Sequence, residues 1–310
     1  MKTKVLYFIA FVLSAFHLKA QAQDSTKASA PVHLQLGSFK TEYSYSPFTI
    51  DGKKMSIQQV GGELTLPIFY KLKDNKLDFL LAGVEYNGLF LSGTGAQFGG
   101  TQFNSFSVPI TYQKGLSAKY SLLATFIPTL SSDLKDISGE DMLYSAFVML
   151  RIRKSATFSY SIGAAYSRQF FGNVLLPVVG IDWNINDRWT FSGILPVSEK
   201  LKYKMSEKSF AGISADFSLG GGSYRLSEEK GSDYLQVQQL RGSLFYEYMP
   251  VKNLSIQVSA GYNFSQQLDR YNKDQKVSGL VPYNSLNDRV PLAEIKKTGV
   301  AFQTGINYRF

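Results

Sequence analysis

The sequence has 310 residues, a formal net charge of +9, 14% aromatic and 18% charged residues, and no cysteine. A soluble domain carries about 25% charged residues, so this composition favours a surface that faces lipid. The lack of cysteine excludes a disulfide framework and a cysteine-linked lipid anchor, and dispersed Lys and Arg argue against a nucleic-acid partner.

The N-terminus has the three parts of a secretory signal peptide. Lys2 and Lys4 supply positive charge, residues 5–16 are apolar, and a small-x-small cleavage site ends at Ala22. The apolar run is shorter than the ~18 residues that a transmembrane helix requires. We therefore expect a signal peptide at 1–22, followed by a short polar periplasmic leader at 23–32.

From residue 33 to residue 310 the chain alternates apolar and polar residues in many short runs. This pattern predicts an all-β fold, a transmembrane antiparallel up-and-down β-barrel of about fourteen strands. The predicted strands are 33–46, 55–71, 77–91, 102–113, 118–130, 142–153, 157–169, 174–185, 189–197, 199–206, 209–225, 235–249, 254–268 and 298–310. The stretch 189–219 forms either a hairpin or one long loop, and a loop would lower the count to twelve.

Two kinds of connection alternate along the chain. Short turns are predicted at 73–76, 114–117, 154–156, 186–188 and 250–253, and longer polar or glycine-rich loops at 47–54, 92–101, 131–141, 227–233 and 269–297. Outer-membrane barrels have short periplasmic turns and longer external loops, so we expect both termini in the periplasm. The longest loop either folds inward, covers the barrel mouth or stays an ordinary external loop.

Proline interrupts four predicted strands. Because proline removes a ladder donor, Pro67, Pro109, Pro128 and Pro177 are expected at bulges or strand ends.

The last strand predicts how the chain is assembled. Alternate residues from Val300 to Phe310 are apolar or aromatic except Thr304, and the residues between them are small or polar. The end of the strand, at Tyr308 and Phe310, is interpreted as an assembly signal read by the barrel-assembly machinery. Other aromatic residues are expected to form an interfacial girdle at the periplasmic strand ends: Tyr112, Tyr120, Trp183, Trp189 and Tyr248.

One set of charged residues points inward by its phase in the predicted strands: Glu63, Glu85, Arg151, Arg153, Asp182, Arg241, Glu247 and Arg309. An ionisable group is kept inside a barrel only where it meets water or an opposite charge. These residues therefore either line a water-filled pore and set its selectivity, or pair across a narrow interior and plug it.

Residue types that carry catalysis or bind cofactors are sparse. His33 is the one histidine of the expected mature chain, and a plain strand residue is favoured over a catalytic base there. The acidic residues within 131–141 match no EF-hand spacing, which favours a solvated loop over a metal site. The glycine clusters lack the following helix of a phosphate-binding loop. We predict no cofactor, no metal and no enzymatic activity.

The motifs "AQAQ" at the end of the signal, "NDRW" in a turn and "NYRF" at the C-terminus resemble those of outer-membrane barrels of Bacteroidetes-type bacteria. In particular, the chain is similar to a family known only as a domain of unknown function. The resemblance implies an outer-membrane location, with membrane lipid and lipopolysaccharide as its surroundings, and a barrel fold.

The favoured function is a passive pore or channel for small solutes. The first alternative is a structural or surface-interaction barrel with a plugged lumen, and a lipid-modifying enzyme is less favoured than either.

Overall fold

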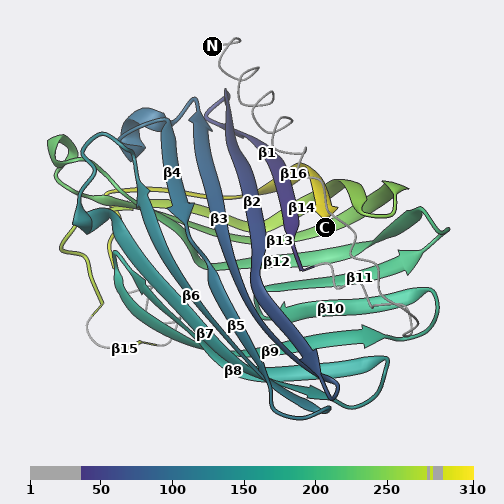
Figure 1. Cartoon of the computed structure of the whole chain (residues 1–310). Helices are drawn as coiled ribbons and strands as arrows, with labels where there is room; N and C mark the ends of the chain where they lie inside the picture. The colour runs from purple at the N-terminus through teal and green to yellow at the C-terminus, as the bar shows by residue number, and fades with distance from the viewer. Residues whose placement is uncertain (1–35, 278–279, 282–288) are drawn as a thin grey trace, which may run out of the picture. The chain divides into compact units, whose positions relative to one another are not determined.

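The computed structural model describes residues 36–277, 280–281 and 289–310 (Figure 1). The predicted signal peptide, the leader at 23–32 and His33 lie outside the described residues. The strands are β1 (Ser38–Ile50), β2 (Lys53–Lys73), β3 (Lys76–Ser92), β4 (Gln102–Ser107), β5 (Ile110–Gly115), β6 (Tyr120–Ser132), β7 (Met142–Arg153), β8 (Phe158–Gln169), β9 (Gly172–Asn184), β10 (Trp189–Leu195), β11 (Ser198–Lys204), β12 (Ser209–Arg225), β13 (Tyr234–Val251), β14 (Leu254–Tyr271), β15 (Leu280–Val281) and β16 (Ala293–Arg309).

The strands form one closed antiparallel barrel. The first and last strands pair with each other, from Ser38 opposite Arg309 to Tyr45 opposite Phe302, and β9 pairs with β10. β4 and β5 both lie between β3 and β6 and together take the place of one strand, and β15 is not part of the wall. The sixteen described strands therefore make a wall of fourteen strand positions. This confirms the predicted barrel of fourteen strands and shows that 189–219 contains a hairpin.

The barrel strands are strongly tilted. In Figure 1, β2 and β3 run steeply across one side, whereas β10 to β12 run nearly horizontally on the other. Opposite walls of a closed sheet cross in this way because closure requires the strands to incline to the barrel axis. None of the helices in the described part of the chain is long and apolar enough to cross a membrane.

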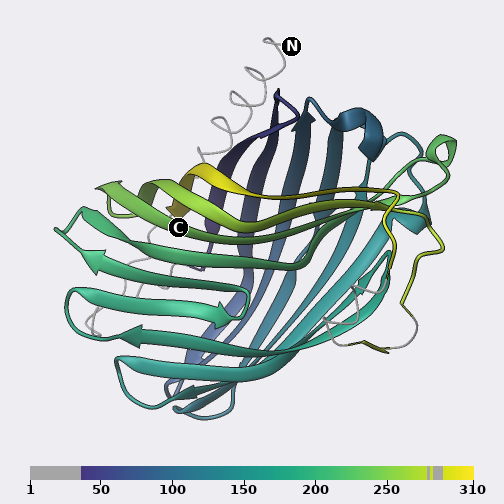
Figure 2. The same ribbon diagram turned by 180° about the vertical axis from the view of Figure 1, so that it is seen from behind.

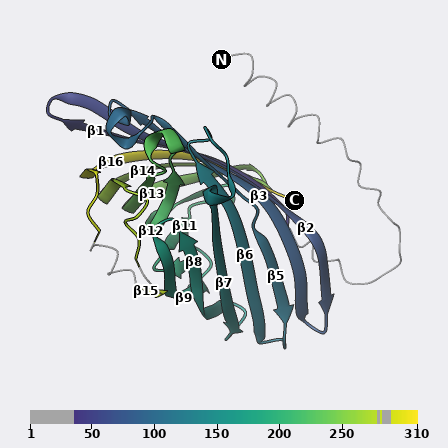
Figure 3. The same cartoon turned by 90° about the vertical axis from the view of Figure 1, so that its left-hand side faces the viewer.

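The two ends of the barrel differ in their connections. We call the end with short reversals, such as Asp74-Asn75, the turn end, and the opposite end the loop end. Among the described residues, three 3₁₀ turns lie at the loop end: η2 (Gly95–Phe98), η3 (Gly139–Asp141) and η4 (Glu228–Lys230) (Figure 3). The first and last strands meet at the turn end, where the backbones of Gly37 and Phe310 exchange two hydrogen bonds.

Two predicted loops are shorter than expected. The loop predicted at 47–54 is wrong, because the β1–β2 ladder continues until Ile50 pairs with Lys53. Asp51 and Gly52 both have positive φ, which is the two-residue turn that matches the twist of paired strands. The loop predicted at 269–297 begins after β14 and ends before β16, so part of it is strand.

The four strand prolines lie at irregular points of the ladders. The register shifts between Pro67 and Phe69, and β4 and β5 are separated at Val108 and Pro109. Pro128 lies next to this break, because its carbonyl accepts a hydrogen bond from the amide of Val108. Pro177 lies beyond the β9–β10 ladder, which extends only to Val179. Each proline thus lies where the ladder on one side is interrupted, although Pro128 and Pro177 pair without a break on the other side, with β7 and β8.

The outer face of the wall is apolar. Val300 and Phe302 each expose 50% of their surface, whereas Ala301 between them exposes 2%. The aromatic residues expected near the turn-end strand termini include Tyr120 and Trp183, which are 45% and 44% exposed. Exposed apolar side chains on a closed ladder are stable in lipid, where every backbone group must be paired, so this wall spans a membrane.

The interior of the loop end is filled by apolar side chains, which we call the plug. Its buried members come from seven strands, η2 and the chain after β12: Ile57, Leu89, Leu91, Phe98, Phe103, Tyr224, Leu226, Leu235, Val237, Leu268 and Ile295. Phe98, Phe103, Leu226 and Leu235 are 0% exposed. The plug therefore excludes water from this part of the barrel.

The plug forms because the last part of β12 turns inward across the lumen while it stays paired with β13. Its ladder with β13 shifts register between Ser218 and Gly222, and Arg225 then pairs in parallel with Ser132 of β6. The β10–β11 hairpin ends at Leu195 and Ser198, so β9 and β12 diverge beyond its tip (Figure 2). At the loop end the wide barrel is thus divided by β12.

A leucine pair on β13 tests the plug. Leu235→Ala should lower the free energy of unfolding by about 2–5 kcal/mol, because the side chain is fully buried and leaves a cavity. Leu244→Ala is the control, since Leu244 is 68% exposed on the lipid face. Urea unfolding followed by heat-modifiable gel mobility measures both. Equal losses in the two variants would contradict a packed plug.

Candidate functional site: the polar lumen

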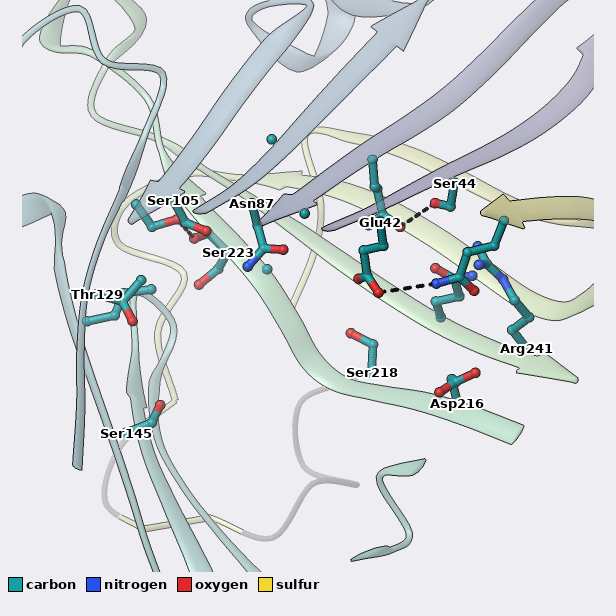
Figure 4. A pocket seen from close by; sticks show the side chains of 18 of the residues that line it. Glu42, Ser44, Asn87, Ser105, Thr129, Ser145, Asp216, Ser218, Ser223 and Arg241 are labelled. Carbon is teal, nitrogen blue, oxygen red and sulfur yellow. Dashed lines mark hydrogen bonds between the residues drawn. The ribbon is translucent and has the colours of Figure 1, made fainter. Parts of the chain in front are cut away.

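A polar cavity of about 460 Å³ lies inside the barrel below the plug. Its lining is mostly Ser, Thr, Asn, Gln and Gly, and Leu143 is its one aliphatic side chain. The charged members of the lining are Lys40, Glu42, Asp216 and Arg241. Figure 4 shows Glu42, Asp216 and Arg241 around the cavity, on strands from different parts of the wall. The cavity can hold water and small hydrophilic solutes.

The carboxylates gather on one sector of the wall. Glu63 of β2 lies between Lys40 of β1 and Glu85 of β3 in the strand register. Glu63 accepts a hydrogen bond from Thr65 at 3.0 Å, and Glu85 accepts one from Asn87 at 2.7 Å. Lys40 forms an ion pair with Glu42 at 3.1 Å. This sector therefore places three carboxylates beside one lysine.

Cationic side chains line the lumen on other strands. Arg151 of β7 forms an ion pair with Asp182 at 3.1 Å and donates to Ser159. Arg151 and Arg153 both line two further cavities toward the turn end, of about 490 and 360 Å³. The structure thus brings together Arg151 and Asp182, two of the residues selected from the sequence. These arginines lie at the turn-end mouth.

The short β11 strand adds lysines that the sequence analysis did not select. Lys202 pairs with Glu247 at 3.4 Å, and Lys200 donates to Gln257 at 2.6 Å. The ammonium group of Lys200 lies 4.3 Å from the ring centroid of Phe245, and that of Lys202 lies 4.8 Å from the ring centroid of Phe210 on β12. The alternation of residues in "SEKLKYK" is a sequence signal that places these two lysines on one face of a strand. Whether that face points into the lumen depends on whether 189–219 forms a hairpin.

Arg241 differs from a free pore-lining cation. It donates to Asn263 at 2.9 Å, and Asn263 in turn donates to Ser46 and Gln266. Arg241 exposes 6% of its surface, and the register shifts on both sides of this network. Arg241 thus joins β13, β14 and β1 as well as lining the cavity.

The three residues selected at the C-terminus, Tyr308, Arg309 and Phe310, lie at the turn end. Arg309 is exposed opposite Ser38, while Tyr308 lies opposite Phe39 and Leu254. The rings of Tyr308 and Phe310 stack with centroids 6.0 Å apart. Phe310 exposes 43% of its surface, so its ring remains accessible beside the closing seam of the barrel.

The carboxylates of the acidic loop pair with two basic residues that end or follow β12. Arg225 pairs with Asp141 at 3.1 Å, with Glu140 at 3.2 Å and with Asp136 at 3.4 Å, and Lys230 pairs with Asp133. Within the described ranges, no group of three His, Cys, Asp or Glu side chains is arranged to hold a metal ion. These carboxylates instead hold the crossing strand in place.

The comparisons with known proteins give a family and distant structural likenesses. A family model described as "Domain of unknown function (DUF6268)" matches residues 19–308. No protein with a curated description matches the chain.

Similar solved structures include an outer membrane channel from Pseudomonas putida F1, with 10% identity, 94% of this chain and 100% of that chain covered, and a TM-score of 0.42. The P. putida toluene transporter TodX is 8% identical, with 91% of each chain covered and a TM-score of 0.41. The NanC porin is 11% identical, with 88% of this chain and 100% of that chain covered and a TM-score of 0.35. Likenesses this distant carry no argument about solute or mechanism.

The pairing of Asp133 with Lys230 predicts a pH dependence at the loop end. Burial acts to raise the pKa of Asp133, but the hydrogen bond and charge of Lys230, together with backbone hydrogen bonds from Lys135 and Ser227, more than offset it, so this pKa lies below its usual value. The stabilisation is fully present above about pH 4 and is lost as the pH falls through the lower native pKa.

We expect hydrogen exchange of residues 226–233 to lose protection below about pH 4. Asp133→Asn should lose protection already at pH 7 and show a smaller further loss in acid. Asp74→Asn, in a turn at the opposite end, is the control and should leave 226–233 unchanged. Full protection in Asp133→Asn at pH 7 would contradict this role.

Proposed function

We propose that this chain, which belongs to the family described as a domain of unknown function (DUF6268), is a passive outer-membrane channel for small hydrophilic solutes. The observation that carries the proposal is the polar cavity of about 460 Å³ inside an apolar, membrane-spanning wall. Side chains fill the interior of a barrel of about eight strands, and a wall of fourteen strands encloses more space. The charged groups kept there need water or an opposite charge, and the cavity has room for water.

The proposed orientation places the turn end in the periplasm. Short turns face the periplasm and longer connections face outside in barrels of this kind. The first and last strands would then close the barrel at the periplasmic side, and the 3₁₀ turns would face the exterior. Outer-membrane lipid and lipopolysaccharide would contact the apolar wall.

The charge arrangement supports passage of both signs of ion. Glu42, Glu63 and Glu85 lie on β1 to β3, whereas Arg151 and Arg153 lie on β7 and two lysines lie on β11. Opposite charges on separate sectors leave the lumen without one dominant sign. The proposal is therefore a weakly selective, non-catalytic channel.

A plugged structural barrel is the second candidate. The plug of eleven buried side chains at the loop end favours it, because that part of the lumen has no room for water. Conductance separates the two candidates.

Refolded protein should give discrete conductance steps in a planar bilayer in potassium chloride. The double variant Glu63→Gln/Glu85→Gln should shift the reversal potential in a salt gradient toward anion selectivity, because it removes two carboxylates from the lumen. Glu207→Gln, which changes an exposed turn residue, is the control. Absence of current from protein shown to be folded and inserted would favour the structural barrel.

We also propose that the barrel-assembly machinery reads the last strand through Tyr308 and Phe310. Phe310→Asp should reduce the amount of heat-modifiable protein in the outer membrane severalfold, since the exposed ring lies beside the closing seam. Phe310→Tyr is the control and should assemble normally. Normal assembly of Phe310→Asp would exclude the residue from recognition.

A further inference from the structure

A further cavity lies beside the plug at the loop end, and we call it the side chamber. Its volume is about 610 Å³, and its lining includes Leu143 of β7, Gln169 of β8 and Tyr234 of β13. Leu235, the next residue on β13, is buried in the plug, so Tyr234 faces the opposite side of that strand. The side chamber thus lies between the back of the crossing strands and the β7–β8 wall.

The side chamber reaches the solvent at the loop end. Its lining includes Lys273, Asp274 and Lys276, which are all exposed, together with exposed Glu140 and Glu228. Cationic and anionic side chains both occur around it. A small hydrophilic solute of either sign can therefore enter the chamber from outside.

The side chamber and the luminal cavity meet at a thin partition. Leu143 and Gln169 line both cavities, and Ser223 of β12 lines the lumen opposite them. The side-chain carbonyl of Gln169 accepts a hydrogen bond from the Ser223 hydroxyl at 2.6 Å. The amide of Gln169 also donates to Ser167 at 2.6 Å. One neutral glutamine therefore spans the distance between β8 and the crossing strand.

This partition is far weaker than the plug. Opening a path through the plug would expose apolar side chains that are packed on all sides. Moving Gln169 breaks neutral hydrogen bonds, which water can replace at small net cost. The partition is the easier route between the lumen and the loop end.

We infer that solutes pass beside the plug, through the side chamber, and that Gln169 and Ser223 form the gate of this route. The inference rests on the proposed channel function and deepens it by naming where passage is controlled. Ser223 directly follows the register shift between Ser218 and Gly222, so the crossing strand bends next to the gate. The route takes small hydrophilic solutes, since its walls are polar at both ends and narrow at Gln169.

The first test truncates two glutamines that line the same cavity. Gln169→Ala should raise single-channel conductance in potassium chloride about twofold, because it widens the narrowest point of the route. Gln59→Ala is the matched control: Gln59 lines the lumen and bonds Ser44, but it lies on β2, away from the side chamber. Its conductance should change by less than that of Gln169→Ala.

The second test uses the absence of cysteine from the chain. Gln169→Cys should conduct, and a charged methanethiosulfonate reagent added from the loop-end side should then reduce the current by at least half. Gln59→Cys, treated in the same way, should lose less current. Heat-modifiable mobility confirms that each variant is folded and inserted.

The outcomes separate the inference from the proposed function. Current in Gln169→Ala above that of the unaltered protein, including current where the unaltered protein is closed, supports the gate. A conducting protein in which Gln169→Ala and Gln59→Ala behave alike overturns the gate and leaves the channel function standing. Silence from all folded variants overturns the channel function, and the gate with it.

Discussion

A closed backbone ladder is the constraint on which this structure depends. In lipid no water can satisfy an unpaired amide or carbonyl, so every wall strand needs a neighbour on each side. The chain meets this requirement toward the turn end by pairing β1 with β16 and β9 with β10. Beyond the tip of the β10–β11 hairpin, the end of β12 pairs with β6 instead. The alternation of apolar and polar residues along each strand follows directly, because one face of the strand contacts lipid and the other faces the lumen.

The crossing of β12 is the main departure from a simple barrel. One buried guanidinium, that of Arg225, meets three carboxylates from the acidic loop, and this cluster fixes the strand against β6. Burial of a charge is tolerated here because its partners are close. The same crossing creates a dry plug on one side of β12 and a wet chamber on the other. The plug thus stabilises the loop end, whereas the space for solutes lies beside it.

Local patterns in the sequence predict the wall well and the interior poorly. Strict alternation, as at Val300 and Phe302, predicts that a segment is a strand and which of its faces points to the lipid. Counting such segments along the chain predicts about fourteen strands. These predictions succeed because each depends only on residues that are neighbours in the sequence. The plug brings together residues such as Phe98 and Leu226, which lie far apart in the chain and follow no period. The gate residues Gln169 and Ser223 are ordinary polar strand residues until β12 crosses the lumen. Similarly, Lys200 and Lys202 acquire an inward direction only once the hairpin is established.

The β10–β11 hairpin has a consequence for how such barrels diversify. Its two strands have seven residues each and pair only with β9, with each other and with β12. A short unit of this kind changes the circumference by two strands at a time and preserves the antiparallel order of all its neighbours. Duplication or deletion of one hairpin would thus alter the bore of the barrel in a single genetic step, while the plug and the closing seam kept their own partners.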